Sequence, residues 1–113
     1  MSVRLEVSVT PDRIGPEDQV TIRLAAVNEG SETVDPKVRA SRLLIDGQPS
    51  MTWSLAISNG AGDMRESALP PGERVEAARQ FGASLFRSPG EHELVAEAGG
   101  VRSDPATVTV ADG

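Results

Sequence analysis

Hydrophobic and polar residues alternate along most of this chain, with the period of two that is typical of strands with one buried face. In residues 3–9, VRLEVSV, valine and leucine fill every second position, and Arg4, Glu6 and Ser8 lie between them. The same pattern predicts further strands at 19–27, 73–81, 92–98 and 106–110. No segment keeps a helical period in the sequence. The pattern therefore favours an all-β protein.

The clearest alternation is the run MTWSLAI, residues 51–57, which we predict to be a strand. It follows Asp46-Gly47, a strong hairpin signal because these residue types tolerate the positive φ of a tight turn. In the segment before that pair the apolar register changes, so we expect a bulge or break near Arg42. Together these signals predict a β-hairpin.

Turn signals separate the predicted strands. Residues 71–73 and 89–91 both read Pro-Gly-Glu, in which proline presets φ and glycine supplies the positive φ of a type II turn. Gly99-Gly100 suits a tight hairpin. Residues 58–72 carry no period, and a connection of that length is usually functional or mobile.

About seven short strands with such turns between them predict an antiparallel sandwich of the immunoglobulin-like or fibronectin III-like class. A chain of 113 residues has the size of one domain, so we assign residues 1–113 to a single sandwich. The segments LPPGE, SPGEHEL and AGGVRSDPATVTV resemble the second half of bacterial immunoglobulin-like domains. Adhesion-related extracellular modules and the small intracellular proteinase inhibitors of bacilli have similar layouts. The resemblance implies a fold and leaves function open.

The composition excludes several partners and chemistries. With 17 acidic and 11 basic residues the formal net charge is −6, and an acidic surface repels nucleic acid and anionic lipid. No cysteine is present, which excludes disulfides and thiolate sites, and no apolar stretch is long enough to span a bilayer. The start, MSVRLEV, enters the strand pattern at once and predicts no signal peptide. We expect a cytoplasmic protein if the chain is complete and an exported one if a leader has been removed.

The only histidine, His92, directly follows the turn that opens the penultimate strand. The domains that this chain resembles commonly carry a tyrosine there, whose hydroxyl bonds to upstream backbone. Alternation places His92 on the same face as Leu94, so we predict a structural ring that packs at the end of the core and donates to a carbonyl within residues 82–88. A pH switch through Glu91 or Glu93 is the alternative.

Trp53 is also predicted to be structural, as the core tryptophan of the sandwich. The alternative is a platform on which a sugar stacks. A carbohydrate module normally exposes more than one aromatic ring, and this chain has one tryptophan, two phenylalanines and no tyrosine.

The unpatterned loop 58–66 is the predicted partner-binding surface, because loops on a rigid sandwich commonly carry recognition. Its candidate contact residues are Asn59, Asp63, Met64, Arg65 and Glu66. A linker without function is the alternative. The carboxylates lack the spacing of a calcium loop, so we predict no metal.

We predict no catalytic residues and no cofactor. A serine nucleophile needs a histidine base and an orienting carboxylate, and the single histidine is expected to face the core. Paired carboxylates can do acid–base work, but among 17 acidic residues some pairs come close by chance. The sequence has no phosphate loop and no dinucleotide-binding glycine pattern.

The leading interpretation is a non-catalytic immunoglobulin-like module that binds a protein partner or spaces neighbouring domains. It would bind through the loop 58–66 or by strand addition at a sheet edge. A small hydrolase inhibitor that places the same loop in a protease cleft is the alternative, and a carbohydrate-binding module is a third.

Overall fold

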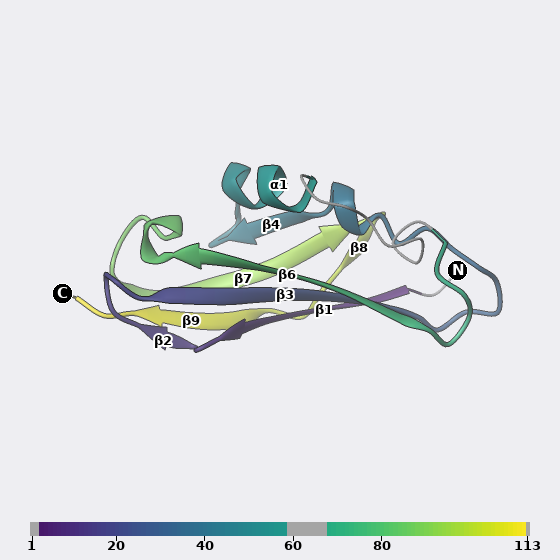
Figure 1. The fold of residues 1–113 in the computed structure, drawn as a ribbon, viewed down its shortest axis with the longest axis horizontal. Coiled ribbons are helices and arrows are strands. Elements are labelled where there is room, and N and C mark those ends of the chain that lie inside the picture. Colours follow the sequence, from purple (N-terminus) through teal and green to yellow (C-terminus); the bar gives the residue numbers. More distant parts are fainter. Residues whose placement is uncertain (1–2, 59–67, 113) are drawn as a thin grey trace.

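Two β-sheets form the body of the protein (Figure 1), and the computed structural model describes residues 3–58 and 68–112. The strands are β1 (Val3–Thr10), β2 (Arg13–Ile14), β3 (Gln19–Asn28), β4 (Arg42–Ile45), β5 (Gln48–Pro49), β6 (Arg74–Gly82), β7 (Gly90–Ala98), β8 (Val101–Arg102) and β9 (Ala106–Val110). The helical elements are α1 (Met51–Ser58) and the 3₁₀ turns η1 (Val38–Ala40) and η3 (Ala83–Leu85).

One sheet has the strand order β1-β3-β6, and the other has the order β2-β9-β7-β4-β5, with β8 paired to β7. Neighbouring strands are antiparallel except β2 and β9, which run parallel. The chain leaves the first sheet after β1 and joins the second as β2, so the first strand is shared between the layers. Strands β1, β3 and β6 correspond to A, B and E of an immunoglobulin-like sandwich, and β9, β7 and β4 correspond to G, F and C. The predicted all-β sandwich is confirmed.

The apolar faces of the two sheets meet in one core. Fully buried side chains come from both sheets, among them Ile22, Leu24, Leu43, Leu94 and Val108. Strand β1 contributes Leu5 as a buried residue, whereas its other inward residues are only partly buried against the same core. The longer strands largely follow the alternation of the sequence, because one face of each sheet is turned to the core and the other to solvent.

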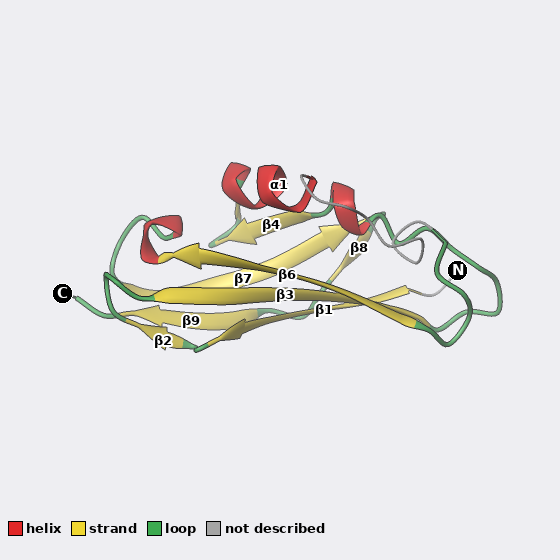
Figure 2. Ribbon diagram, in the orientation of Figure 1, coloured by secondary structure: helices red, strands yellow, loops and turns green. Residues whose placement is uncertain are grey.

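Residues 51–57 were predicted to be a strand, and this prediction is wrong: they form the helix α1 (Figure 2). Trp53 and Ile57 are four residues apart, so they share a face in a strand and in a helix alike. Both are buried, whereas Met51 and Leu55, which a strand would also have turned inward, are 72% and 58% exposed. The pattern of apolar residues was therefore compatible with both structures.

Ser50 marks the beginning of this helix. Its Oγ accepts a hydrogen bond from the backbone N–H of Trp53 at 3.2 Å, which is the geometry of an N-cap. Its carbonyl accepts the N–H of Ser54, the first bond of the helical ladder. A serine directly before the apolar run was the sequence signal for a helix start.

We expect Ser50→Ala to lower the free energy of unfolding by about 1 kcal/mol, because it removes the N-cap acceptor. Chemical denaturation followed by circular dichroism measures this change. Thr52→Ala, at an exposed position in the same helical turn, is the matched control and should change stability much less. Equal losses from the two variants would contradict the capping role.

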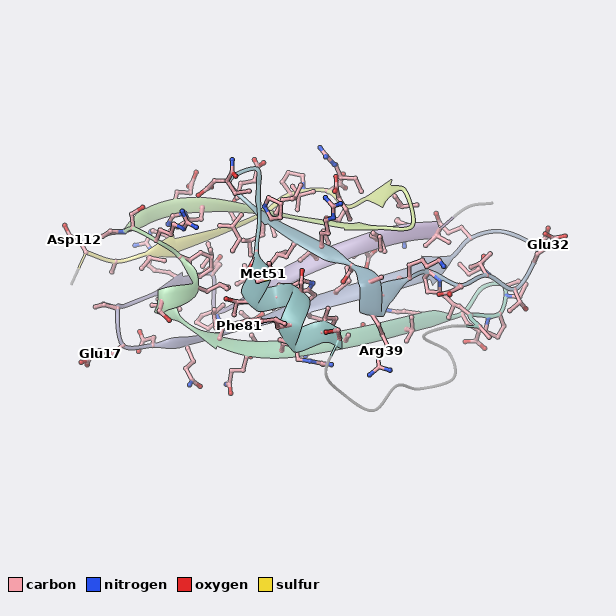
Figure 3. The ribbon with its side chains drawn as sticks, turned by 90° about the horizontal axis from the view of Figure 1, so that it is seen from above. Glu17, Glu32, Arg39, Met51, Phe81 and Asp112 are labelled. Atoms are coloured by element: carbon pink, nitrogen blue, oxygen red, sulfur yellow. The ribbon has the colours of Figure 1, made fainter. Side chains whose placement is uncertain are left out.

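Helix α1 lies on the side of the sandwich between β4 and β6, as the view from above shows (Figure 3). It packs against η1, β4 and β6, and the Nε of Arg79 on β6 donates to the carbonyl of Ala56 at 3.1 Å. The outer face of the helix presents Met51 and Leu55. Within the described residues no helix is both long and apolar enough to cross a membrane.

The break expected near Arg42 coincides with the beginning of β4. The residues before it, Val38–Ala40, form the turn η1 rather than a strand. Lys37 precedes this turn with φ 63°, in the left-handed region. The register change in the sequence thus marks the passage from a helical turn into a strand.

Candidate functional site

The predicted partner-binding residues Asn59, Asp63, Met64, Arg65 and Glu66 lie outside the described residues. Ser58, the described residue that leads into this segment, is exposed at the end of α1. The assignment of a binding loop to residues 58–66 therefore stays a prediction.

Trp53 lies in the core, fully buried on the inner face of α1. Its indole Nε1 donates to Ser41 Oγ at 3.2 Å, and its ring centroid is 6.0 Å from that of Phe81. Phe81 and Phe86 are also buried. With no tyrosine in the chain, neither the tryptophan nor a phenylalanine presents a ring face on which a sugar could stack.

His92 occupies the third position of β7, where its side chain turns into the end of the core and is 7% exposed. Its Nε2 lies 2.7 Å from the carbonyl oxygen of Ser88, which is within the segment 82–88 where the sequence predicted an acceptor. The ring stacks on Phe86, with centroids 5.2 Å apart and planes at 24°. The ring therefore packs and bonds at the corner that precedes β7.

Asp46 is the partner that sequence reasoning missed. Its Oδ2 lies 2.6 Å from His92 Nδ1, and its Oδ1 accepts the backbone N–H of Glu93 at 2.9 Å. The N–H of Asp46 in turn donates to the carbonyl of Glu93. The pairing of Ile45 with Leu94 between β4 and β7 brings these residues together. Asp46 was recognised in the sequence only as half of an Asp-Gly turn.

The two acids that the sequence offered as partners of His92 do not fill that role. Glu91 and Glu93 flank the histidine on β7 and are exposed, because successive side chains of a strand point to opposite faces. Glu93 contributes its backbone to Asp46, as described above, and its carboxylate is not the partner of the ring.

The pKa values of His92 and Asp46 shift in opposite directions. Burial by itself lowers the pKa of His92, but the hydrogen bonds to Asp46 and Ser88 and the charge of Asp46 outweigh it, so the pKa lies above the ordinary 6.5. The hydrogen bond from the Glu93 N–H, and then the one from His92, lower the pKa of Asp46 below 3.8. The pair thus favours a charged imidazolium beside a charged carboxylate.

A shallow depression of about 380 Å³ lies over this pair. Its walls come from the β4–β5 turn, the first turn of α1 and the corner around η3, and include Asp46, Met51, Leu85, Arg87 and His92. Serine hydroxyls also line it, but both ring nitrogens of His92 already face acceptors. The imidazole therefore has no free nitrogen with which to take a proton from a serine.

Metal ligands do not gather in the part of the chain that the structure describes: no three residues among its histidine, aspartate and glutamate side chains are placed to hold an ion. Asp46 and His92 lie close together, but they form a hydrogen bond with each other.

No family model matches this sequence, and no curated protein sequence matches it either. Solved structures match its fold. A β-glucosidase from Erythrobacter marinus superposes with a TM-score of 0.65 at 16% identity, over 97% of this chain and 15% of that chain. An alkylpurine DNA glycosylase of Pseudomonas fluorescens, bound to DNA containing an abasic-site analogue, gives 0.61 at 16% identity, over 97% of this chain and 30% of that chain.

The CARDB domain of a Pyrococcus furiosus protein, in complex with di-metal ions, superposes with a TM-score of 0.57 at 17% identity. Here the match covers 96% of this chain and 93% of that domain. This chain thus spans a small part of the two larger proteins and nearly all of the CARDB domain. Identities this low show the fold, an immunoglobulin-like sandwich. The resemblance to adhesion modules or proteinase inhibitors stays a prediction.

Proposed function

We propose that this chain is a non-catalytic immunoglobulin-like module that binds a protein partner or spaces neighbouring domains. The observation that carries the proposal is the recurrence of its whole fold in different settings. The same sandwich is nearly all of a CARDB domain, at 93% of that chain, and 15% of a β-glucosidase. A fold that serves in such different proteins takes its function from its surface rather than from its core.

The positions of the two chain ends support a spacer role. Strand β1 begins and strand β9 ends toward opposite ends of the long axis (Figure 1), along which the molecule measures 48 Å. Neighbouring domains attached at these ends would be held apart by the length of the sandwich.

A sheet edge supports a binding role. The three-stranded sheet ends in β1 and β6, which have 8 and 9 residues, whereas the strands β2 and β5 that end the other sheet have two residues each. Helix α1 packs against β6. Among the described residues no strand pairs with β1 beyond β3, so β1 is the edge best suited to an added peptide strand.

The outer face of the same sheet is occupied by paired charges. Arg74 contacts Glu6 on β1 at 3.0 Å and Glu76 on its own strand at 2.8 Å, and Arg4 and Arg23 add further pairs with these acids. Exposed pairs add little stability, but they keep this face hydrated. Recognition by this sheet would therefore use the backbone of its edge rather than its face.

Two variants test where a partner binds. One replaces residues 59–66 by glycine and serine, and the other, Ser8→Lys, places a charge on the exposed side of the β1 edge, a substitution that opposes strand pairing. Thr21→Lys, which adds the same charge on β3, between β1 and β6, is the control. Proteins captured from lysate and secreted fraction of the native organism are identified, and their affinity for each purified variant is then measured.

We expect one variant to weaken binding at least about tenfold, which corresponds to about 1.4 kcal/mol, while Thr21→Lys has little effect. A partner that binds all variants equally would contradict both surfaces. A protease as partner, with the bond between residues 64 and 65 resistant to cleavage, would favour the inhibitor. Capture of no protein by the parent chain would leave the spacer role.

A further inference from the structure

The buried ring of His92 lies between two hydrogen-bond acceptors. The carboxylate of Asp46 faces Nδ1 at 2.6 Å, and the carbonyl of Ser88 faces Nε2 at 2.7 Å. A neutral imidazole carries one N–H, so it can donate to only one of them and must turn a lone pair toward the other. A doubly protonated ring donates to both. The geometry is therefore complementary to the imidazolium form.

This ring connects three segments of the fold. Asp46 belongs to the turn between β4 and β5, Ser88 belongs to the corner that follows η3, and His92 itself is in β7. Strand β5 has two residues, and among the described strands it pairs only with β4. A two-stranded hairpin is weak without further support. Helix α1 begins directly after β5. The attachment of Asp46 thus fixes the turn from which α1 departs.

The charges that face His92 come from few elements in the described part of the chain. The turn supplies Asp46, and the corner supplies Arg87, which lines the same depression. On β7 the neighbouring acids Glu91 and Glu93 are exposed on the opposite face. On β9 the residue paired with His92 is Val108, which carries no charge, and the ring against the imidazole is that of Phe86. Asp46 is accordingly the acid that responds to the charge of the ring.

We propose that His92 is a proton-operated latch: its doubly protonated ring fastens the Asp46 turn to the corner at Ser88, and loss of one proton breaks one of these two contacts, so that the ring no longer joins the turn to the corner. In the released state the carboxylate of Asp46 keeps the hydrogen bond from the Glu93 N–H, and the wall of the depression in front of α1 is loosened. The rest of the sandwich keeps its strand pairing, because the latch contributes no bond between β1, β3 and β6.

The direction of the pH dependence follows from the two shifts. The pKa of His92 in the folded protein lies above 6.5, so the latch stabilises fully below about pH 6.5 and is lost as the pH rises through that higher pKa. The pKa of Asp46 lies below 3.8, so its contribution is present above about pH 4 and is lost as the pH falls through the lowered value. The latch is closed between these limits.

Nuclear magnetic resonance tests the latch without a variant, because the single histidine gives one set of ring signals. We expect both ring nitrogens to be protonated at about pH 6, and the ring to titrate above 6.5, the ordinary value. Amide exchange, corrected for its intrinsic pH dependence, is followed at Asp46 and Glu93. Their protection should fall roughly tenfold above the titration, the factor that about 1.4 kcal/mol of lost hydrogen bonding produces, while Leu24 on β3 stays protected.

Variants separate the latch from a general effect of pH. Asp46→Asn should bring the ring pKa to 6.5 or below, because burial of the ring then acts without the carboxylate, and the pH dependence of the turn should disappear. Glu91→Gln, which neutralises an exposed acid beside the histidine, should leave the ring pKa and the pH dependence of the turn nearly unchanged. A wild-type ring that titrates at or below 6.5, or equal loss of protection at Asp46 and Leu24, would overturn the proposal.

Discussion

Replacing Trp53 by alanine is expected to lower the free energy of unfolding by about 3–5 kcal/mol. The side chain is fully buried between α1 and the sheets, and its loss removes apolar burial and leaves a cavity beside Phe81. It also leaves the hydroxyl of Ser41 without its indole donor. Domains of this size are stable by about 5–15 kcal/mol, so the variant loses a large part of its stability.

Urea denaturation followed by circular dichroism measures this loss, since the variant has no tryptophan for fluorescence. Trp53→Phe keeps a ring but not the N–H donor, and it should therefore be less destabilising than alanine. Leu55→Ala changes an apolar residue of the same helix that is 58% exposed, and it should cost below about 1 kcal/mol. A loss for Trp53→Ala as small as that for Leu55→Ala would contradict the burial of the Trp53 side chain in the core.

The strands were predictable where one face of a sheet is buried. Residues 19–27 and 106–110 were expected to be strands, and they correspond to β3 (Gln19–Asn28) and β9 (Ala106–Val110). A period of two is imposed on these segments by the core on one side and water on the other. Periodicity of this kind reports burial directly, and so the layers of the sandwich followed from the sequence.

Helix α1 was not predictable from periodicity, because buried residues four positions apart fit both a strand and a helix. Trp53 was correctly expected to be inside, since a large apolar residue is buried in either structure. The deciding group was the hydroxyl of Ser50 at the N-cap. Local capping chemistry, rather than the hydrophobic pattern, carried the information that was needed.

The surroundings of His92 were predictable in part. A nearby carbonyl was expected because the corner precedes β7 in the chain, and Ser88 is four residues away. Asp46 is 46 residues away, and it reaches the ring only because β4 pairs with β7 in one register. A sequence shows local neighbours, but a pairing between distant strands depends on the whole sheet.

Replacing Asn28 by aspartate is the second substitution expected to be severely destabilising. Asn28 is fully buried at the end of β3. Its Nδ2 donates to the carbonyls of Glu32 and Leu69, at 2.7 and 2.9 Å, and its Oδ1 accepts the N–H of Gly30 at 2.9 Å. The side chain therefore ties the loop after β3 to the segment that leads into β6.

A carboxylate at this position can accept from Gly30 but cannot donate to either carbonyl. It would place a buried charge against two oxygens, and we expect Asn28→Asp to lower the free energy of unfolding by about 3–5 kcal/mol at neutral pH. Asn28→Ala loses all three hydrogen bonds but adds no charge, so about 2–3 kcal/mol is expected. Glu29→Gln, at the next and exposed position, should change stability by less than about 1 kcal/mol.

Denaturation over a range of pH separates the charge from the lost bonds. Burial against two carbonyl oxygens raises the pKa of the new carboxyl in the folded state, because its protonated form can donate to one of them. Its ordinary pKa is about 3.9, so the deficit of Asn28→Asp relative to Asn28→Ala should be largest at neutral pH and shrink as the pH falls through the raised value. A deficit that does not change with pH would mean that the substituted side chain turns outward to water, and that the two carbonyls do not hold it in place.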